Sequence, residues 1–395
     1  VHQNQVKTFL GKITLLATGG AGKVYLYTSN PDTATGDGIA MAYRVGAKLT
    51  NMEFFQFHPT CLYHPEAKSF LISEAVRGEG GILRGKNGRA FMEDHHPQGC
   101  LAPRDVVARA IDFEMKRSGD DCVYLDVTHI EPYRIRERFP NIYKTCLNFG
   151  FDMTRELVPV VPAAHYMCGG VMTDLNGQTS IRRLFVSGEV CYSGLHGANR
   201  LGGNSLTDLL VFGKIAGESA AQRATESDGF ADVDEAEIAE VIAETLAPFD
   251  REGGENPAKV VEDLREMMQE KVGIIRNGSL LEEALSDLEE LEARADLTSP
   301  GGSRIYNPGW HQALELSAML DVSRMCALAA LQREESRGGH TRDDFPVPDH
   351  KHWGKINSVI VQEADGSMSI EHRTYPPIDD ELKALLDAED LHEEG

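Results

Sequence analysis

The order of apolar and polar residues along the chain predicts an α/β region followed by helices. The apolar run in residues 12–22, KITLLATGGAG, ends in a glycine turn, as buried strands that lead into a nucleotide-binding helix do. Small residues at helical spacing follow in residues 33–47. Residues 102–119 predict a further helix, with Pro103 in its first turn and Gly119 at its end. We therefore expect a nucleotide-binding α/β unit near the start of the chain.

The second half of the pattern is mainly helical. Residues 171–190 contain an NG turn followed by a short apolar strand, and residues 204–224 predict a helix. Apolar residues recur every three to four positions through the acidic stretch 234–335, which predicts a helix bundle. Residues 357–375 alternate around a DG turn and predict a hairpin, whereas the acidic residues 376–395 are expected to be loosely held.

Composition narrows the class of protein. The 395 residues are 41% hydrophobic and 26% charged, as in ordinary globular proteins. No apolar run reaches the roughly 18 residues of a membrane span, and we expect no signal peptide. The net charge of −23 argues against binding to nucleic acid or to anionic membranes. Seven cysteines without paired spacing predict reduced thiols, a cytoplasmic location and no metal site.

Charge and cysteine content both change near residue 200. Residues 1–200 carry 22 basic and 20 acidic side chains, whereas residues 201–395 carry 17 and 42. Six of the seven cysteines precede the change. The asymmetry suggests two regions with different histories.

Four polar residues stand in apolar or glycine-rich surroundings. They are His58 in EFFQFHPT, Arg104 in LAPRD, His165 in PAAHYMCGG and Arg200 in GANRLGG. A guanidinium and neutral imidazoles that converge on one pocket suit a small carboxylate, because a guanidinium donates paired hydrogen bonds to two oxygens. Taken singly, a histidine in such surroundings is more often structural, and an arginine in a loop is more often part of a surface ion pair.

For two further residues and one pair, a functional role and a purely structural role are again both open. Glu74 and Arg77 share one turn and are either functional or a plain helix-face pair. Glu189 ends a strand, where it would hold a ribose hydroxyl or cap a turn, and Asp37 in TGDG is open to the same two uses. The glycines of residues 191–206, CYSGLHGANRLGGNSL, would let a ligand approach the main chain closely.

Several of these motifs, in this order, carry a family resemblance. ATGGAGKVY, TGDGIAMAYR, MEFFQFHPTCLYHPEAKSFLISEAVRGEGG, LAPRDVVARAID, PVVPAAHYMCGGVMTD, SGEV and LHGANRL strongly resemble the flavoprotein family of L-aspartate oxidase, fumarate reductase and succinate dehydrogenase. The resemblance covers nearly the whole chain. The N-terminal FAD-binding segment of the family, with its glycine fingerprint, is expected to be missing.

The resemblance changes in character along the chain. Residues 1–200 look closest to L-aspartate oxidase. Residues 201–395, with NRLGGNSLTDLLVFGKIAG, YNPGWHQALEL and REESRGGHTRDDFP, look closest to the flavoprotein subunit of succinate dehydrogenase or fumarate reductase. Because this coincides with the change in charge, we hypothesise a junction of two homologous sequences near residue 200.

The resemblance implies a fold and a domain plan. The expected fold is an incomplete α/β FAD-binding domain with an inserted α+β capping domain, followed by a C-terminal helical bundle. The implied parts are an FAD-binding domain in residues 1–52 and 167–225, a capping and substrate domain in 53–166, a helical domain in 226–350, and a hairpin with an acidic tail in 351–395.

The resemblance also implies roles for individual residues. Arg104 would transfer a proton beside the substrate, and Glu74 and Arg77 would relay protons to it. An arginine is an unusual acid or base because its pKa exceeds about 12, so this step needs a desolvated site and an acidic neighbour. A dicarboxylate would be bound by His58, Ser73, His165 and Arg200. FAD would be lined by Gly19, Gly20, Asp37, Glu189, Asn204, Ser205 and Leu206.

Three functions follow from these implications. The first is FAD-dependent oxidation of L-aspartate to iminoaspartate, a step of NAD biosynthesis, with fumarate or oxygen as acceptor. The second is a succinate dehydrogenase or fumarate reductase flavoprotein subunit that passes electrons to an iron–sulfur partner. The third is a catalytically incomplete fragment. Because every implied substrate contact lies at or before Arg200, the first is favoured.

Overall fold

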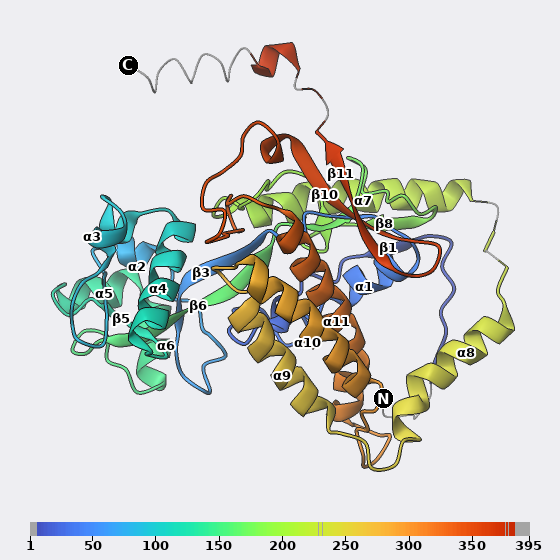
Figure 1. Ribbon diagram of the computed structural model, residues 1–395, viewed down its shortest axis with the longest axis horizontal. Coiled ribbons are helices and arrows are strands. Elements are labelled where there is room, and N and C mark those ends of the chain that lie inside the picture. The colour runs from blue at the N-terminus through green and yellow to red at the C-terminus, as the bar shows by residue number, and fades with distance from the viewer. Residues whose placement is uncertain (1–5, 228, 231, 376, 378, 384–395) are drawn as a thin grey trace.

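The computed structural model describes residues 6–227, 229–230, 232–375, 377 and 379–383 (Figure 1). Strands in this part of the chain form a parallel pair, a five-stranded mixed sheet and a four-stranded antiparallel sheet. The predicted order is confirmed, because an α/β part with an inserted domain precedes a group of helices. Most of the predicted acidic tail lies outside the described residues.

The parallel pair consists of β1 (Thr14–Leu16) and β8 (Leu184–Val186). Both strands lie where the sequence predicts them, but the expected burial of β1 is wrong, since Thr14 is exposed and Leu15 keeps 40% of its surface in water. Strand pairing does not account for this, because the partner strand β8 is buried; β1 is exposed because few other elements of the described chain pack against it. Two helices belong to the same α/β part: α1 (Asp37–Arg44) and α7 (Asn204–Glu226).

The five-stranded sheet joins segments from distant parts of the chain. Its order is β11-β10-β2-β7-β9, and Val359 of β10 lies opposite Thr50 of β2. The predicted hairpin is confirmed as β10 and β11, and its pairing with β2 makes it part of the α/β unit (Figure 1). The strands are β2 (Leu49–Thr50), β7 (Gly170–Met172), β9 (Cys191–Tyr192), β10 (Ile356–Gln362) and β11 (Met368–Thr374).

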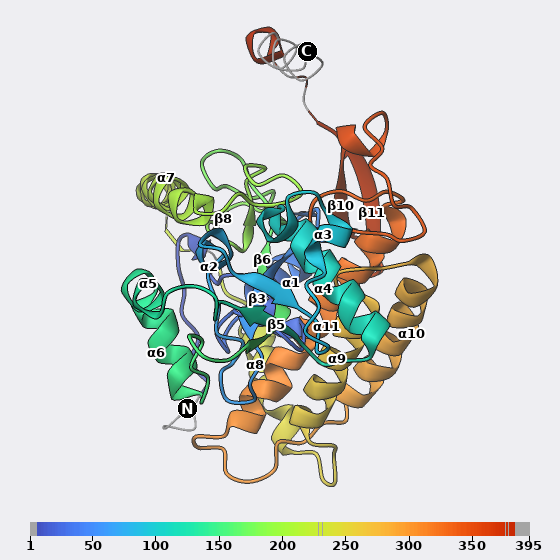
Figure 2. The same ribbon diagram turned by 90° about the vertical axis from the view of Figure 1, so that its left-hand side faces the viewer.

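The capping region lies to one side and is joined to the rest by two long strands (Figures 1 and 2). Its antiparallel sheet has the order β3-β6-β5-β4. The strands are β3 (Phe55–Leu62), β4 (Ile82–Arg84), β5 (Val123–Asp126) and β6 (Val158–Met167). The helices are α2 (Ala75–Gly78), α3 (Met92–His95), α4 (Arg104–Ser118), α5 (Pro132–Arg138) and α6 (Pro140–Asn148).

This region has a hydrophobic core of its own. Leu83, Ile111, Leu125 and Val160 are among its fully buried members. Helix α4 ends at a left-handed Gly119, as the sequence predicts, because glycine adopts positive φ without a Cβ penalty. The core comes from one continuous stretch of chain, so the capping region can be packed without side chains from elsewhere.

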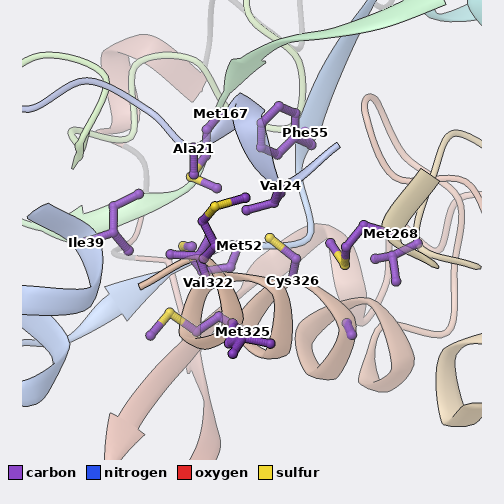
Figure 3. Close-up of a cluster of buried hydrophobic side chains, with 14 of the residues drawn as sticks. Ala21, Val24, Ile39, Met52, Phe55, Met167, Met268, Val322, Met325 and Cys326 are labelled. Atoms are coloured by element: carbon purple, nitrogen blue, oxygen red, sulfur yellow. The ribbon is translucent and has the colours of Figure 1, made fainter. Parts of the chain in front are cut away.

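The C-terminal helices share a second core with the α/β part. Met52 and Phe55 pack together with Val322, Met325 and Cys326 of α11 (Figure 3). The helices are α8 (Glu235–Leu246), α9 (Pro257–Lys271), α10 (Gly278–Ala295) and α11 (Pro308–Gln332). Short 3-10 turns are η1 (Gly22–Val24), η2 (Gly99–Leu101), η3 (Ala247–Phe249) and η4 (Trp353–Lys355).

Side-chain caps explain where the bundle helices start. Asn256, Asn277 and Asn307 each accept a hydrogen bond from a main-chain N–H in the first turn of α9, α10 and α11. Helix α8 has no buried residue, and its C-terminal end meets α11, where Trp310 Nε1 donates to the Thr245 carbonyl at 2.8 Å. None of the helices in the described part of the chain is long and apolar enough to span a membrane. The domain boundaries stay a prediction.

Candidate active site

Two histidines and two arginines from four segments lie around one place between the capping region and the α/β part. His58 is in β3, His165 is in β6, Arg104 begins α4, and Arg200 lies in the glycine-rich loop before α7. The two imidazole rings are 5.5 Å apart. Arg104 reaches across to the loop, where its guanidinium would leave less than 3.0 Å to a Cβ on Gly202.

Both histidines are held in the neutral form. Burial, followed by the charges of nearby cationic groups, lowers the pKa of His58 well below its ordinary value and that of His165 to about 4. The main-chain N–H of Thr60 donates to His58 Nδ1 at 3.3 Å, so the proton of that ring is on Nε2. The Ser29 hydroxyl lies 2.8 Å from His165 Nδ1. A neutral imidazole held in this way offers one N–H to an acceptor.

Arg200 is buried and only partly satisfied. Its guanidinium carbon lies 4.5 Å over the ring of Tyr166, a cation–π contact. Burial lowers its pKa, although an arginine stays protonated at neutral pH. In the described part of the chain, Arg200 Nε has no hydrogen-bond partner. A buried cation with an unused donor is suited to a carboxylate ligand.

A second group of charges continues from Arg104 into the capping region. Arg104 Nε donates to one carboxylate oxygen of Glu74, and Arg77 Nη2 lies 3.8 Å from the other. Arg77 is buried, donates to the Cys100 carbonyl at 2.6 Å, and has a lowered pKa because of that burial. Ser73 accepts a weak hydrogen bond from the N–H of Ala75 at the start of α2. The predicted trio therefore forms a connected chain.

The residues expected to hold FAD lie mostly together on the α/β side. Gly19 and Gly20 follow β1, and Glu189 follows β8. A Cβ on Gly20 would lie less than 3.0 Å from the carboxylate of Glu189. Any larger residue at position 20 would therefore displace that carboxylate. Glu189 accepts from the Met167 N–H at 3.0 Å, and burial raises its pKa to about 7.

This arrangement fits a flavin nucleotide. A buried carboxyl group beside a glycine turn can accept from, or donate to, a sugar hydroxyl. Asn204, Ser205 and Leu206 form the first turn of α7, whose positive dipole end favours an electron-rich ligand, although the N–H groups of Asn204 and Leu206 already donate to main-chain carbonyls at 3.2 Å. Asp37 differs from the others, since it begins α1 and accepts from the Thr35 hydroxyl, and its charge, after burial, raises the pKa of Glu315 in α11.

Four contact residues were missed in the sequence. Ser29 and Thr60 orient the two histidines, Tyr166 stacks on Arg200, and Gln56 contacts Arg200 directly. A signal existed only for Gln56, a single amide between two phenylalanines. Thr60 contacts a histidine only two residues away, whereas Ser29 and Tyr166 are ordinary residue types whose contacts join distant segments of the chain.

Comparison with known protein families shows which family the chain belongs to. The family described as FAD binding domain matches residues 2–206, and the family described as fumarate reductase flavoprotein C-term matches residues 261–383. L-aspartate oxidase 1 of Ralstonia nicotianae is 48% identical over 373 residues, which are 94% of this chain and 66% of that protein. The chain belongs to the FAD-dependent flavoprotein family of the L-aspartate oxidases, succinate dehydrogenases and fumarate reductases. Its resemblance to that family, predicted from the motifs, is confirmed.

Other members of this flavoprotein family are also similar to the chain, in sequence and in structure. L-aspartate oxidase of Yersinia pestis is 45% identical over 87% of this chain and 62% of its own length. A quinol–fumarate reductase structure superposes with a TM-score of 0.84 at 37% identity, over 93% of this chain and 67% of that one. The Mycobacterium smegmatis Sdh1 complex with UQ1 gives a TM-score of 0.81 at 41% identity, over 93% and 62%.

These matches bear on the hypothesis of a junction. The chain spans just under two thirds of the length of the curated relatives. A single L-aspartate oxidase nevertheless aligns with 94% of the chain, straight through residue 200. The C-terminal family match carries the fumarate reductase name, in agreement with the resemblance seen in residues 201–395. The alignments therefore do not require two joined sequences.

Proposed function

We propose that the protein is an FAD-dependent oxidoreductase that oxidises L-aspartate to iminoaspartate. The observation that carries the proposal is the convergence of two neutral donors and two cations on one place between the capping region and the α/β part: His58, His165, Arg104 and Arg200. A C4 dicarboxylate presents two anionic ends that such a set can bind at once. The relatives named L-aspartate oxidase support the choice of the amino acid over other diacids.

Binding would fix the substrate in the orientation that the reaction needs. Arg200 would hold one carboxylate through its guanidinium group, and the neutral histidines would donate to carboxylate oxygens without adding positive charge. Holding both ends places the Cα–H of L-aspartate in a single orientation, which recovers much of the entropic cost of bringing reactants together. Bound FAD supplies the hydride acceptor.

Proton movement would fall to the charged chain in the capping region. Forming a C=N bond from L-aspartate removes a hydride from Cα and a proton from the amino nitrogen. Arg104 lies beside the proposed binding place and donates to Glu74, which in turn faces the buried Arg77. Glu74 is 39% exposed, so it can exchange protons with water. We propose that Arg104 and Glu74 together carry the proton outward.

A turnover assay tests the proposal. L-aspartate should drive peroxide formation in air by the FAD-loaded protein, and Arg104→Gln should lower the rate by roughly 10²–10⁴-fold, the range typical of a lost acid–base group. Arg109→Gln is the matched control, because Arg109 lies in the same helix and pairs with Asp105 at 2.9 Å. Full activity of the Arg104 variant contradicts the assigned role.

A second function has support of its own. The match of residues 261–383 and the similarity to the quinol–fumarate reductase structure favour a dehydrogenase or reductase subunit with an iron–sulfur partner. Succinate-driven dye reduction without L-aspartate-driven peroxide formation would select this alternative. A purified protein that retains no yellow flavin would instead favour the catalytically incomplete fragment.

A further inference from the structure

A tight turn in the C-terminal region lies directly behind the proposed carboxylate site. The N–H of Arg337 donates to the His340 carbonyl at 2.8 Å, and the N–H of His340 returns a hydrogen bond to the Arg337 carbonyl at 3.0 Å. Gly338 occupies the turn with φ of +55°. Residues 337–340 therefore form a closed turn with little freedom to move.

Both glycines of this turn lie against the backbone of segments that lead into the site, at Ala198 and Phe55. The N–H of Gly339 donates to the carbonyl of Ala198 at 2.8 Å. A Cβ on Gly338 would come within 3.0 Å of that same carbonyl, and a Cβ on Gly339 would lie 2.7 Å from the carbonyl of Phe55. Neither contact can be relieved by rotating a side chain, because the opposing atoms belong to the backbone.

The two segments touched by the turn are locked to each other through Gln56. Its Nε2 donates to Asn199 Oδ1 at 2.6 Å and to the Arg200 carbonyl at 2.7 Å. Its Oε1 accepts from Arg200 Nη2 at 2.9 Å. One buried amide thus fixes both the main chain and the guanidinium of Arg200. Ala198, two residues earlier, is the point at which the turn supports this arrangement.

Buried polar groups hold the turn from its other side. Arg276 Nη1 donates to His340 Nδ1 at 2.9 Å and to the Glu53 carbonyl at 2.8 Å. Since an arginine can only donate, the proton of the ring is on Nε2, which donates to the Arg333 carbonyl at 3.1 Å. Arg276 and His340 have no exposed surface. The turn therefore has a rigid base in the C-terminal region.

We propose that Gly338 is a positioning residue for Arg200. It acts through Ala198, so the C-terminal region sets the geometry of a substrate carboxylate contact from a distance. The inference rests on the proposed role of Arg200 in binding the dicarboxylate. The C-terminal region would then help to shape the substrate site, although none of its own side chains is proposed to contact the substrate.

Gly338→Ala tests the inference in the FAD-loaded protein. Moving the Ala198 carbonyl should displace Arg200 and raise KM for the dicarboxylate by roughly ten- to a hundredfold, with a smaller change in kcat, since small misplacements weaken oriented binding. Gly301→Ala is the matched control, because its φ of +57° imposes the same backbone strain and no atom lies within 4 Å of the added Cβ. The control should leave KM unchanged.

Hydrogen exchange on the unaltered protein gives a readout that does not depend on the variant folding. Saturating succinate, used as an unreactive or slowly reacting diacid, should slow exchange of the Gly339 N–H, which donates to the Ala198 carbonyl. The N–H of Gly119, at the distant end of α4, should exchange at an unchanged rate. Unchanged exchange at Gly339 overturns the inference.

Arg200→Lys separates failure of the inference from failure of the proposed function. If Arg200→Lys raises KM and Gly338→Ala does not, Arg200 binds the substrate without support from the turn, and only the inference falls. If Arg200→Lys leaves KM unchanged, the proposed carboxylate contact is wrong, and both fall. A raised KM in both variants, with Gly301→Ala normal, supports both.

Discussion

The capping region and the pair formed by β1 and α7 differ in how far their apolar side chains are gathered into a core, although the capping region also exposes some, such as Leu101 and Phe113. In the capping region Ile111 and Leu125 are fully buried in a core drawn from one stretch of chain. On β1 and α7, by contrast, Leu15 is 40%, Leu210 is 74% and Val211 is 48% exposed. Exposed apolar side chains that gather on a surface favour contact with other chains or segments.

This difference separates the two halves of the proposed active site. His58, Glu74, Arg77 and Arg104 rest on the enclosed core of the capping region. Asn204 begins the helix whose apolar side chains are exposed. The substrate half of the site therefore has packing of its own, whereas the helix at its cofactor half gains less stability from burial. The following predictions test that contrast.

The largest expected effect is in the core of the capping region. Leu125→Ala should lower the free energy of unfolding by about 2–5 kcal/mol, because it leaves a cavity in a closed core. Leu210→Ala should change it by less than about 0.5 kcal/mol, since most of that side chain is already in water. Urea unfolding measures both. Equal losses in the two variants would contradict the contrast.

A pH effect of intermediate size is expected from Glu189. Burial raises its pKa to about 7, so the folded state holds a proton that the unfolded state releases between about pH 4.5 and 7. Stability from this group is therefore complete below pH 4.5 and declines as pH rises through 7, by up to about 3 kcal/mol. Glu189→Gln should remove this decline from the urea-unfolding free energy.

The control for the Glu189→Gln variant is a second titrating group that is present in both proteins. His165, with a pKa lowered to about 4, makes stability fall as pH drops from 6.5 towards 4, and it does so in both proteins. The difference between wild type and variant thus isolates Glu189. Parallel pH profiles would show that its carboxyl group is not buried in solution.

The smallest effect on stability should accompany a clear effect on association. Leu210→Lys adds a charge to the exposed face of α7 and keeps a good helix former. The unfolding free energy should shift by less than about 0.5 kcal/mol. Self-association, followed by light scattering against concentration, should decrease. Unchanged association would show that this apolar face does not mediate contact between copies.

Local rules predicted much of the fold. The ends of α4, the hairpin of β10 and β11, and the helix α7 follow from glycine, proline and alternation patterns, and all were found. The exposure of β1 was not predicted, because an apolar run indicates burial only if other elements cover it. The pairing of β10 with β2 joins residues about 300 positions apart and has no local signal.

The candidate site was predicted through its charged residues and missed in its supporting ones. His58, Arg104, His165 and Arg200 stand out because charged or titratable groups are costly to bury without a reason. Ser29 and Tyr166 do not, because their contacts join segments that are distant in the sequence. Their roles became visible only when these segments were seen side by side.

The pairing of β10 with β2 has a consequence for synthesis on the ribosome. Thr50 leaves the ribosome long before Val359, its partner across the sheet, is made. One edge of β2 must therefore wait without hydrogen bonds while about 300 further residues are translated, at a rate of roughly 5–20 residues per second. During those tens of seconds the capping region can fold alone, and the nascent chain is most exposed to wrong strand partners and to chaperones.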